Sequence, residues 1–184
     1  MGSSEIVTTW VAENRGVFDQ WIGEAMRLFW EDASVRLPRT EAERRNGMEG
    51  WLEQRRLKLG AALQEEFPHQ FPSLAQHLSS SFITSVFDGL VWPEVKPEIQ
   101  RYAISGFAAA WVGRHMGDAT TLGTPKRDGQ QWCVPIGVRG HGDDLGQIVL
   151  NLDGEVIPEV TTTRSDLLEA MREPSLSSLA TAAR

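Results

Sequence analysis

The sequence predicts an α+β protein, in which a bundle of about four helices packs on a small antiparallel sheet of about three strands, followed by a terminal helix. Apolar residues recur every three to four positions in residues 1–117, as on one face of a helix. In residues 132–138 and 148–152 they alternate with a period of two, as in half-buried strands. We expect residues 1–117 and 118–173 to form one structural domain, with a flexible tail at 174–184.

Four helices are expected before residue 117, at positions 4–36, 40–66, 73–90 and 97–116. The polar turn at Asn14 can interrupt the first of them, and Thr40 begins a capping-box pattern for the second. Proline has no amide donor, so Pro68 and Pro93 are expected to lie in links, and Pro97 in the first turn of the last helix.

A stripe of small residues follows the last of these helices at every fourth position, at Ser105, Ala109, Gly113 and Gly117. Small side chains allow another element to approach the helix axis closely. We therefore expect the sheet to pack against this helix.

The C-terminal third begins with an expected loop at 117–130, followed by strands at 132–138, 148–152 and 155–158. Pro135 lacks an amide donor, which predicts an edge position or a bulge for the first strand. That edge is a possible place for strand addition by a partner. Asp153-Gly154 is a hairpin signal, and Thr163 can cap a short helix from Arg164 to Arg172.

Residues 106–158 also follow a recognisable order of elements. Ala108-Ala109-Ala110 is Ala-rich, Trp132-Cys133-Val134 opens a strand with an aromatic residue, a second strand contains Ile148-Val149-Leu150, and Asp153-Gly154-Glu155-Val156 is an acidic hairpin. This order resembles a PepSY-type domain over less than a third of the chain, without the usual longer turn before the Gly-Glu pair. The resemblance implies a small non-catalytic binding or inhibitory module, and it contributes no catalytic residues.

A divalent metal site is one interpretation of the polar residues near the end of the last helix and the first hairpin turn. His115 and Asp118 would have to meet His141 and Asp143 there, since two histidines and a carboxylate can hold a divalent ion. The alternative is that all four are exposed turn residues, because turns favour Gly and Asp. The alternative is favoured, and no cofactor is expected.

Two other chemical interpretations concern the same hairpin. Cys133 would need His141 as a base to act as a nucleophile, and it is otherwise a small strand hydrophobe. The glycine-rich loop 137–142 holds Arg139 and could bind an anion through backbone amides, but a simple hairpin loop is favoured.

Tryptophan is unusually frequent, with seven residues against one tyrosine. Trp10 and Trp21 are three helical turns apart and should share a face, whereas Trp30 falls almost opposite Trp21. Trp30 therefore either packs beneath the turn at Leu37 or contributes to a partner surface, where tryptophan is enriched. We include Trp30, Trp92 and Trp132 with Arg139 and His141 as candidate binding residues.

The leading functional hypothesis is a non-enzymatic, bacterial-type accessory or regulatory protein that acts through protein–protein contacts, with a homodimer as one option. A net charge of −7 disfavours nucleic acid and anionic membranes as partners. The N-terminus has no signal-peptide pattern and the single cysteine suits a reducing compartment, so a soluble cytoplasmic protein is expected. The alternatives are a small-molecule or metal site at the helix–hairpin junction, and inhibition of a protease or toxin, which only the PepSY resemblance implies.

Overall fold

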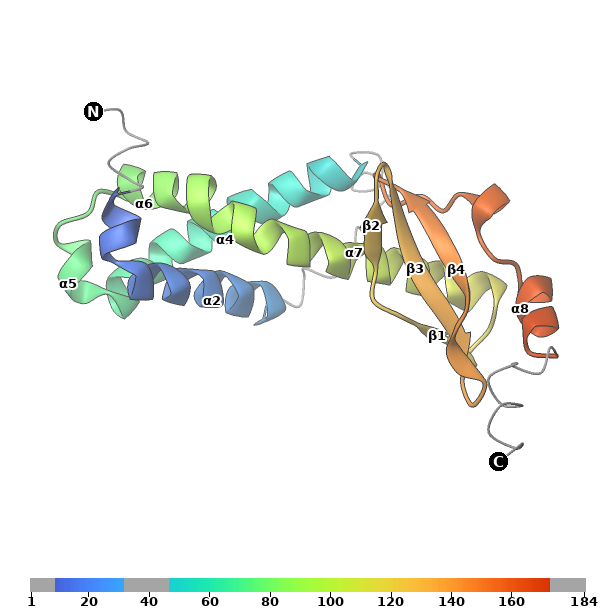
Figure 1. The fold of residues 1–184 in the computed structure, drawn as a ribbon. Coiled ribbons are helices and arrows are strands. Elements are labelled where there is room, and N and C mark those ends of the chain that lie inside the picture. Colours follow the sequence, from blue (N-terminus) through green and yellow to red (C-terminus); the bar gives the residue numbers. More distant parts are fainter. Residues whose placement is uncertain (1–8, 32–46, 173–184) are drawn as a thin grey trace. The chain divides into compact units, whose positions relative to one another are not determined.

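The structure, a computed structural model, describes residues 9–31 and 47–172 and confirms the α+β class (Figure 1). The chain forms two compact units, Met1–Gln100 and Arg101–Arg184, and their boundary lies within a helix. The expected capping box at Thr40, the turn at Leu37 and the tail at 174–184 lie outside the described residues.

Unit 1 is helical throughout its described elements. Residues 9–13 form a helical turn, and the elements that follow are α2 (Arg15–Glu31), α4 (Gly47–Gln70), α5 (Pro72–Ala75), α6 (Ser80–Val86), the π-helix η2 (Phe87–Val91) and the start of α7 (Trp92–His115). The expected break at Asn14 is confirmed, and its side-chain amide donates to the Trp10 carbonyl over 2.9 Å. The inner face expected for the second helix is confirmed by the burial of Met48, Trp51, Leu52, Arg55, Leu59 and Leu63.

The prediction that Pro93 and Pro97 separate two helices was wrong, because α6, η2 and α7 follow one another without a gap. The change of helix type comes directly before Pro93, where the Trp92 amide donates to the Phe87 carbonyl five residues earlier. A proline ring clashes with the carbonyl one α-turn before it, and a wider turn at that point relieves the clash. Pro93 is therefore accommodated inside a continuous helix, and Pro97 lies further along α7.

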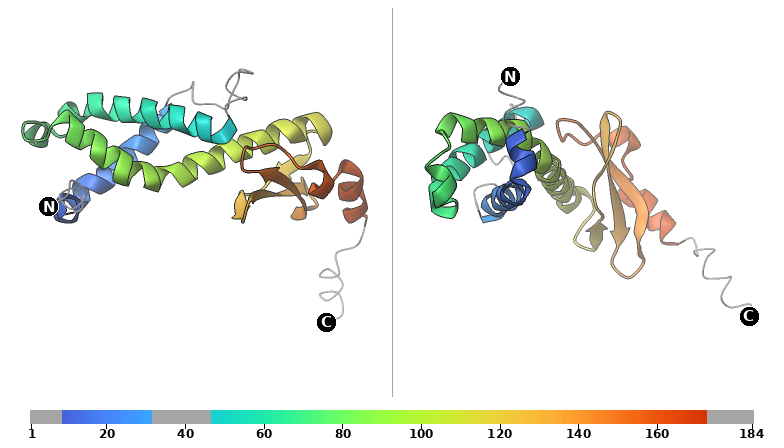
Figure 2. Two further views of the ribbon diagram at one scale, coloured as in Figure 1. Left: turned by 90° about the horizontal axis from the view of Figure 1, so that it is seen from above. Right: turned by 60° about the vertical axis from the view of Figure 1, so that its left-hand side comes forward.

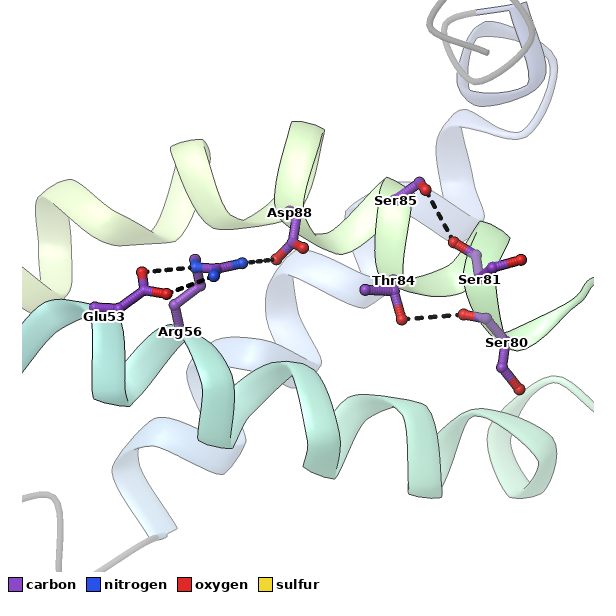
Figure 3. Close-up of polar contacts among 7 residues, drawn as sticks. All are labelled: Glu53, Arg56, Ser80, Ser81, Thr84, Ser85 and Asp88. Carbon is purple, nitrogen blue, oxygen red and sulfur yellow. Dashed lines mark hydrogen bonds and ion pairs between the residues drawn. The ribbon is translucent and has the colours of Figure 1, made fainter.

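Two contacts from one face of α4 hold this wide turn. Arg56 donates to the Asp88 carboxylate over 2.5 Å and also binds Glu53 (Figure 3). One helical turn later, a Cβ on Gly60 would lie 3.0 Å from the ring of Phe87, so the ring packs directly on the backbone of α4. The Arg56 hydrogen bonds lower the pKa of Glu53. An ion pair and a close packing contact thus fix neighbouring residues of η2.

The expected single helix at 73–90 was also wrong, because a new helix starts at Ser80. The hydroxyl of Ser79 accepts from the Phe82 amide over 3.2 Å, which is an N-cap. The hydroxyls of Thr84 and Ser85 donate back to the carbonyls of Ser80 and Ser81 (Figure 3). Serine-rich segments offer the backbone such local partners and so favour a helix start over a helix interior.

The link expected at Pro68 lies inside α4, which continues to Gln70. The ring centroid of Phe67 lies 4.9 Å from that of Trp21 and 5.2 Å from that of Phe71. The packing of these rings compensates for the hydrogen bond that Pro68 cannot make. Tertiary packing therefore allows the helix to continue past Pro68, where local preferences alone would end it.

We predict that deletion of Gly89 in a Pro93→Ala background, where no proline ring requires the wide turn, leaves unit 1 folded, with a change of less than about 1 kcal/mol in its free energy of unfolding relative to Pro93→Ala alone. Gly89 is exposed in the π-turn, and a Cβ on it would meet nothing within 4 Å. Removing one residue from a π-turn restores α-helical hydrogen bonding while both flanking faces keep their orientation.

The control is deletion of Ala61, an exposed residue in the regular helix α4. This deletion rotates one half of the buried face by about 100° relative to the other, so we expect a loss of about 4 kcal/mol or more. Thermal and urea unfolding followed by circular dichroism compares the two variants. Equal destabilisation would contradict the interpretation of η2 as an accommodated extra residue.

Unit 2 contains a four-stranded antiparallel sheet with β3 at its centre. The strands are β1 (Thr120–Leu122), β2 (Lys126–Asp128), β3 (Gln131–Val138) and β4 (Gly142–Asn151). β4 pairs with one side of β3, while β1 and β2 share the other side. The expected loop at 117–130 therefore contains two short strands that the sequence did not indicate.

Pro135 lies in the central strand and not at the expected edge, whereas the alternative expectation, a bulge in this strand, agrees with the register shift between Ile136 and Val138 in the β3–β4 pairing. The Gly123 amide donates to the Pro135 carbonyl over 2.8 Å, so the missing amide of Pro135 faces the gap between β1 and β2. A Cβ on Gly123 would lie 3.0 Å from the Cβ of Pro135, which explains the small residue at this gap. A proline is tolerated in β3 because the partner strand is divided opposite it.

One face of the sheet packs on the second half of α7, which runs along it in Figures 1 and 2. The completely buried residues are Val134, Ile136, Ile148 and Leu150 in the sheet and Ile104 and Ala108 in the helix. The small residues Ala109, Gly113 and Gly117 are exposed instead, so the expected stripe does not contact the sheet. The face that packs lies one residue, or about 100°, away from it.

The third strand expected at 155–158 is only an isolated bridge between Leu150 and Val156, and Pro158 opens the 3₁₀-helix η3 (Pro158–Val160). The terminal helix α8 (Arg164–Ala170) is confirmed with its capping box. The amide and hydroxyl of Thr163 both donate to Asp166 over 2.8 Å, which lowers the pKa of that carboxyl.

We predict that Gly154→Ala destabilises unit 2 by about 2 kcal/mol or more. Gly154 confirms the expected hairpin turn with a φ of +81°, and an added Cβ would lie 2.7 Å from the Phe107 ring. Gly113→Ala is the control, because Gly113 is exposed in α7 with nothing within 4 Å. We expect this control to stabilise the chain by about 0.5–1 kcal/mol in urea unfolding. Similar effects of the two substitutions would contradict the packing of Phe107 on this turn.

Candidate functional site

The pairing of β1 with β3 brings the end of α7 close to the β3–β4 turn. Thr120 is in register with Val138, and the Arg139 amide donates to the Ala119 carbonyl over 2.9 Å. Asp118 and His141 belong to the segments joined in this way, and both are exposed, as is Arg139. This end of unit 2 is therefore an open polar turn cluster.

Among the expected metal ligands, the described side chains of His115, Asp118 and His141 do not form a three-residue site. No group of three or more His, Cys, Asp or Glu residues that could hold a metal ion exists among the described residues, and the side chain of Asp143 is not described. His115 stacks on Trp111, with 4.7 Å between the ring centroids. The structure thus supports the alternative in which His115, Asp118 and His141 are surface residues.

Cys133 and His141 lie at opposite ends of the hairpin. Cys133 is half-buried in β3, in register with Lys126 and Val149. It precedes the end of β3 at Val138 by five residues, which is roughly 16 Å of strand. His141 lies beyond that end, so it is too far away to act as a base for the thiol.

Of the three candidate tryptophans, Trp30 alone is exposed. Trp30 is 53% exposed at the end of α2, whereas Trp92 and Trp132 are 8% and 4% exposed. Trp92 packs against Phe87, and Trp132 lies in the buried face of β3. Neither buried indole can present a surface to a partner in this structure.

An aromatic cluster in unit 1 was not identified as a site from the sequence. Trp10 lies at a centroid distance of 5.8 Å from Trp21 and 5.5 Å from Phe82. On a continuous helix the two tryptophans would share a face but lie about 16 Å apart, so their contact depends on the break at Asn14. Trp21 also contacts Phe67 and Phe71, so the residues 9–13, α2, α4 and α6 meet here (Figure 1). Spacing does not reveal these contacts, because each pair is either separated by the helix break at Asn14 or far apart in sequence.

The cluster extends from the core to the surface. Trp21 and Phe67 are each 1% exposed, while Trp10, Phe71 and Phe82 are half-buried. We call these three half-buried residues the aromatic surface. Trp21 Nε1 is buried without a hydrogen-bond partner among the described residues. The aromatic surface therefore presents ring area that is supported from below by rigid, buried rings.

The shifted ionisable groups among the described residues lie in structural contacts. Hydrogen bonds with Arg27 lower the pKa of Glu24, and hydrogen bonds from Thr163 lower that of Asp166. Glu53 and then Asp88 raise the pKa of Arg56. These pKa shifts are consequences of ion pairs and of a helix cap.

Comparisons with protein-family models, with curated proteins and with solved structures find no match for the chain. Across residues 9–31 and 47–172, no helix combines the length and apolar character needed to cross a membrane.

We predict that excess Mn²⁺ changes the Tm of the wild type by less than about 1 °C, and that His141→Ala behaves in the same way. The reason is that His115, Asp118 and His141 do not gather into a ligand set. Differential scanning fluorimetry of both proteins measures the shift. A larger increase in the wild type that disappears in His141→Ala would show that these residues do bind a metal.

Proposed function

We propose that the protein is a non-enzymatic accessory or regulatory protein that acts through contact with another protein, and that the aromatic surface of unit 1 makes this contact. The observation that carries the proposal is the half-buried set Trp10, Phe71 and Phe82 above the buried Trp21. Large aromatic side chains held rigidly at a surface are the typical anchors of protein interfaces.

The packing of Trp10 adds a second argument. Its ring is held at 5.8 Å from Trp21 and 5.5 Å from Phe82, so little side-chain freedom remains to be lost on binding. This restriction favours the aromatic surface as a contact within unit 1.

The resemblance of residues 106–158 to PepSY-type domains is compatible with this class of function, because it also implies a binding module. It remains a prediction about unit 2 and does not bear on the aromatic surface. A homodimer is one form of the proposed contact, in which the partner is a second copy of the chain.

We predict that Trp10→Ala weakens partner binding roughly thirtyfold, since loss of a tryptophan anchor typically costs about 2 kcal/mol. Affinity isolation with the full chain identifies the bound protein, and titration with that protein gives the Kd. Light scattering across concentrations measures self-association in case the partner is a second copy.

Trp30→Ala is the matched control, because it removes an exposed tryptophan of the same unit outside the aromatic surface. We expect it to retain binding, and circular dichroism must show that both variants are folded. Loss of binding in Trp30→Ala alone would move the contact to α2. A wild type that is strictly monomeric and retains no protein would contradict the proposed function itself.

A further inference from the structure

β4 contains a segment that is prone to pair with other strands. Residues 145–152 carry no charge and no proline, and they include Ile148, Val149 and Leu150. Uncharged windows with strong β-propensity form intermolecular sheets when an edge is free. Asp143, Asp144 and Asp153 flank this window, as charged residues often do beside such segments.

One edge of this strand pairs with β3, and the other is covered by residues 155–162, which we call the edge strap. The Ile157 amide donates to the Val149 carbonyl over 2.8 Å, and the Thr162 amide donates to the Gln147 carbonyl over 2.9 Å. At the turn, the Asn151 amide donates to the Glu155 carbonyl over 2.9 Å. The carbonyls of Gln147 and Val149 on the outer edge are therefore satisfied.

Side-chain hydroxyls satisfy the remaining amides of the same edge. The Val149 amide donates to Thr161 Oγ1 over 3.0 Å, and the Gln147 amide donates to Thr162 Oγ1 over 2.9 Å. Another strand would place backbone carbonyls at these two positions. The strap itself forms only one isolated bridge with β4, so two threonines replace the ladder that it lacks.

Gly146 allows the strap to come this close. A Cβ at Gly146 would lie 2.5 Å from Thr162 Oγ1, well inside contact distance. Thr161 is 6% exposed, so its hydroxyl and the Val149 amide are shielded from water. If the strap were released, these amides would be open to water and to pairing with another strand, because an exposed sheet edge presents a row of unpaired donors and acceptors.

We propose that the edge strap prevents β4 from pairing with the β4 of a second copy of this chain, and that its release produces a β4-linked dimer. An antiparallel pair centred on Val149 would place Gln147 opposite Asn151, and no charged residues would oppose each other within residues 147–151. The second copy is therefore compatible in charge at every position of this segment. The inference concerns unit 2 and does not depend on the aromatic surface.

The test is the double substitution Thr161→Val and Thr162→Val, which keeps the side-chain shape and removes both hydroxyls. We expect amide exchange at Gln147 and Val149 in dilute samples to rise by at least tenfold relative to wild type. With increasing concentration, light scattering should show a doubling of mass relative to wild type. Thr84→Val is the control, because its hydroxyl bonds only within α6.

Gly146→Ala provides an independent variant if the double substitution does not fold, since its added Cβ displaces Thr162 while the sequence of the strap stays unchanged. We expect the same doubling of mass. Adding Gln147→Lys to either variant should restore the wild-type mass, because a charge on the edge disfavours pairing. Faster exchange without any mass change, or unchanged exchange at Gln147 and Val149, would overturn the proposal.

Discussion

The backbone hydrogen bonds of β3 and β4 are the constraint on which unit 2 depends. A buried amide or carbonyl must find a hydrogen-bond partner, and in this unit regular strands do not supply every one of them. Pro135 removes one donor from the central strand, and the opposite strand is divided into β1 and β2 at that point. On the other side, threonine hydroxyls complete the edge of β4. The irregular parts of the unit follow from this requirement.

Unit 1 depends on close contacts between α4 and its neighbours. Gly60 and Arg56 lie one turn apart on α4 and hold Phe87 and Asp88 of the wide turn. Nearer the C-terminal end of α4, Phe67 supports the aromatic cluster around Trp21. Through these contacts α4 holds the wide turn before Pro93, and it also supports the aromatic surface that we propose as a contact.

Burial decides which of the unusual tryptophans can contribute to function. Composition showed an excess of indoles, but it could not separate core from surface. Trp92 and Trp132 are part of the core, whereas Trp10 is held at the surface by neighbouring rings. The functional proposal rests on that difference, and the polar residues of the β3–β4 turn contribute nothing to it.

The α+β class, the inner face of α4, the turn at Gly154 and the cap at Thr163 could be predicted from the sequence. Each depends on periodicity or on residues within a few positions of one another, where local sterics and hydrogen bonding dominate. The central position of Pro135, the strands β1 and β2, the continuous helix through Pro93 and the aromatic surface required the tertiary structure. In each case a partner distant in sequence supplies the hydrogen bond or the packing that local chemistry lacks.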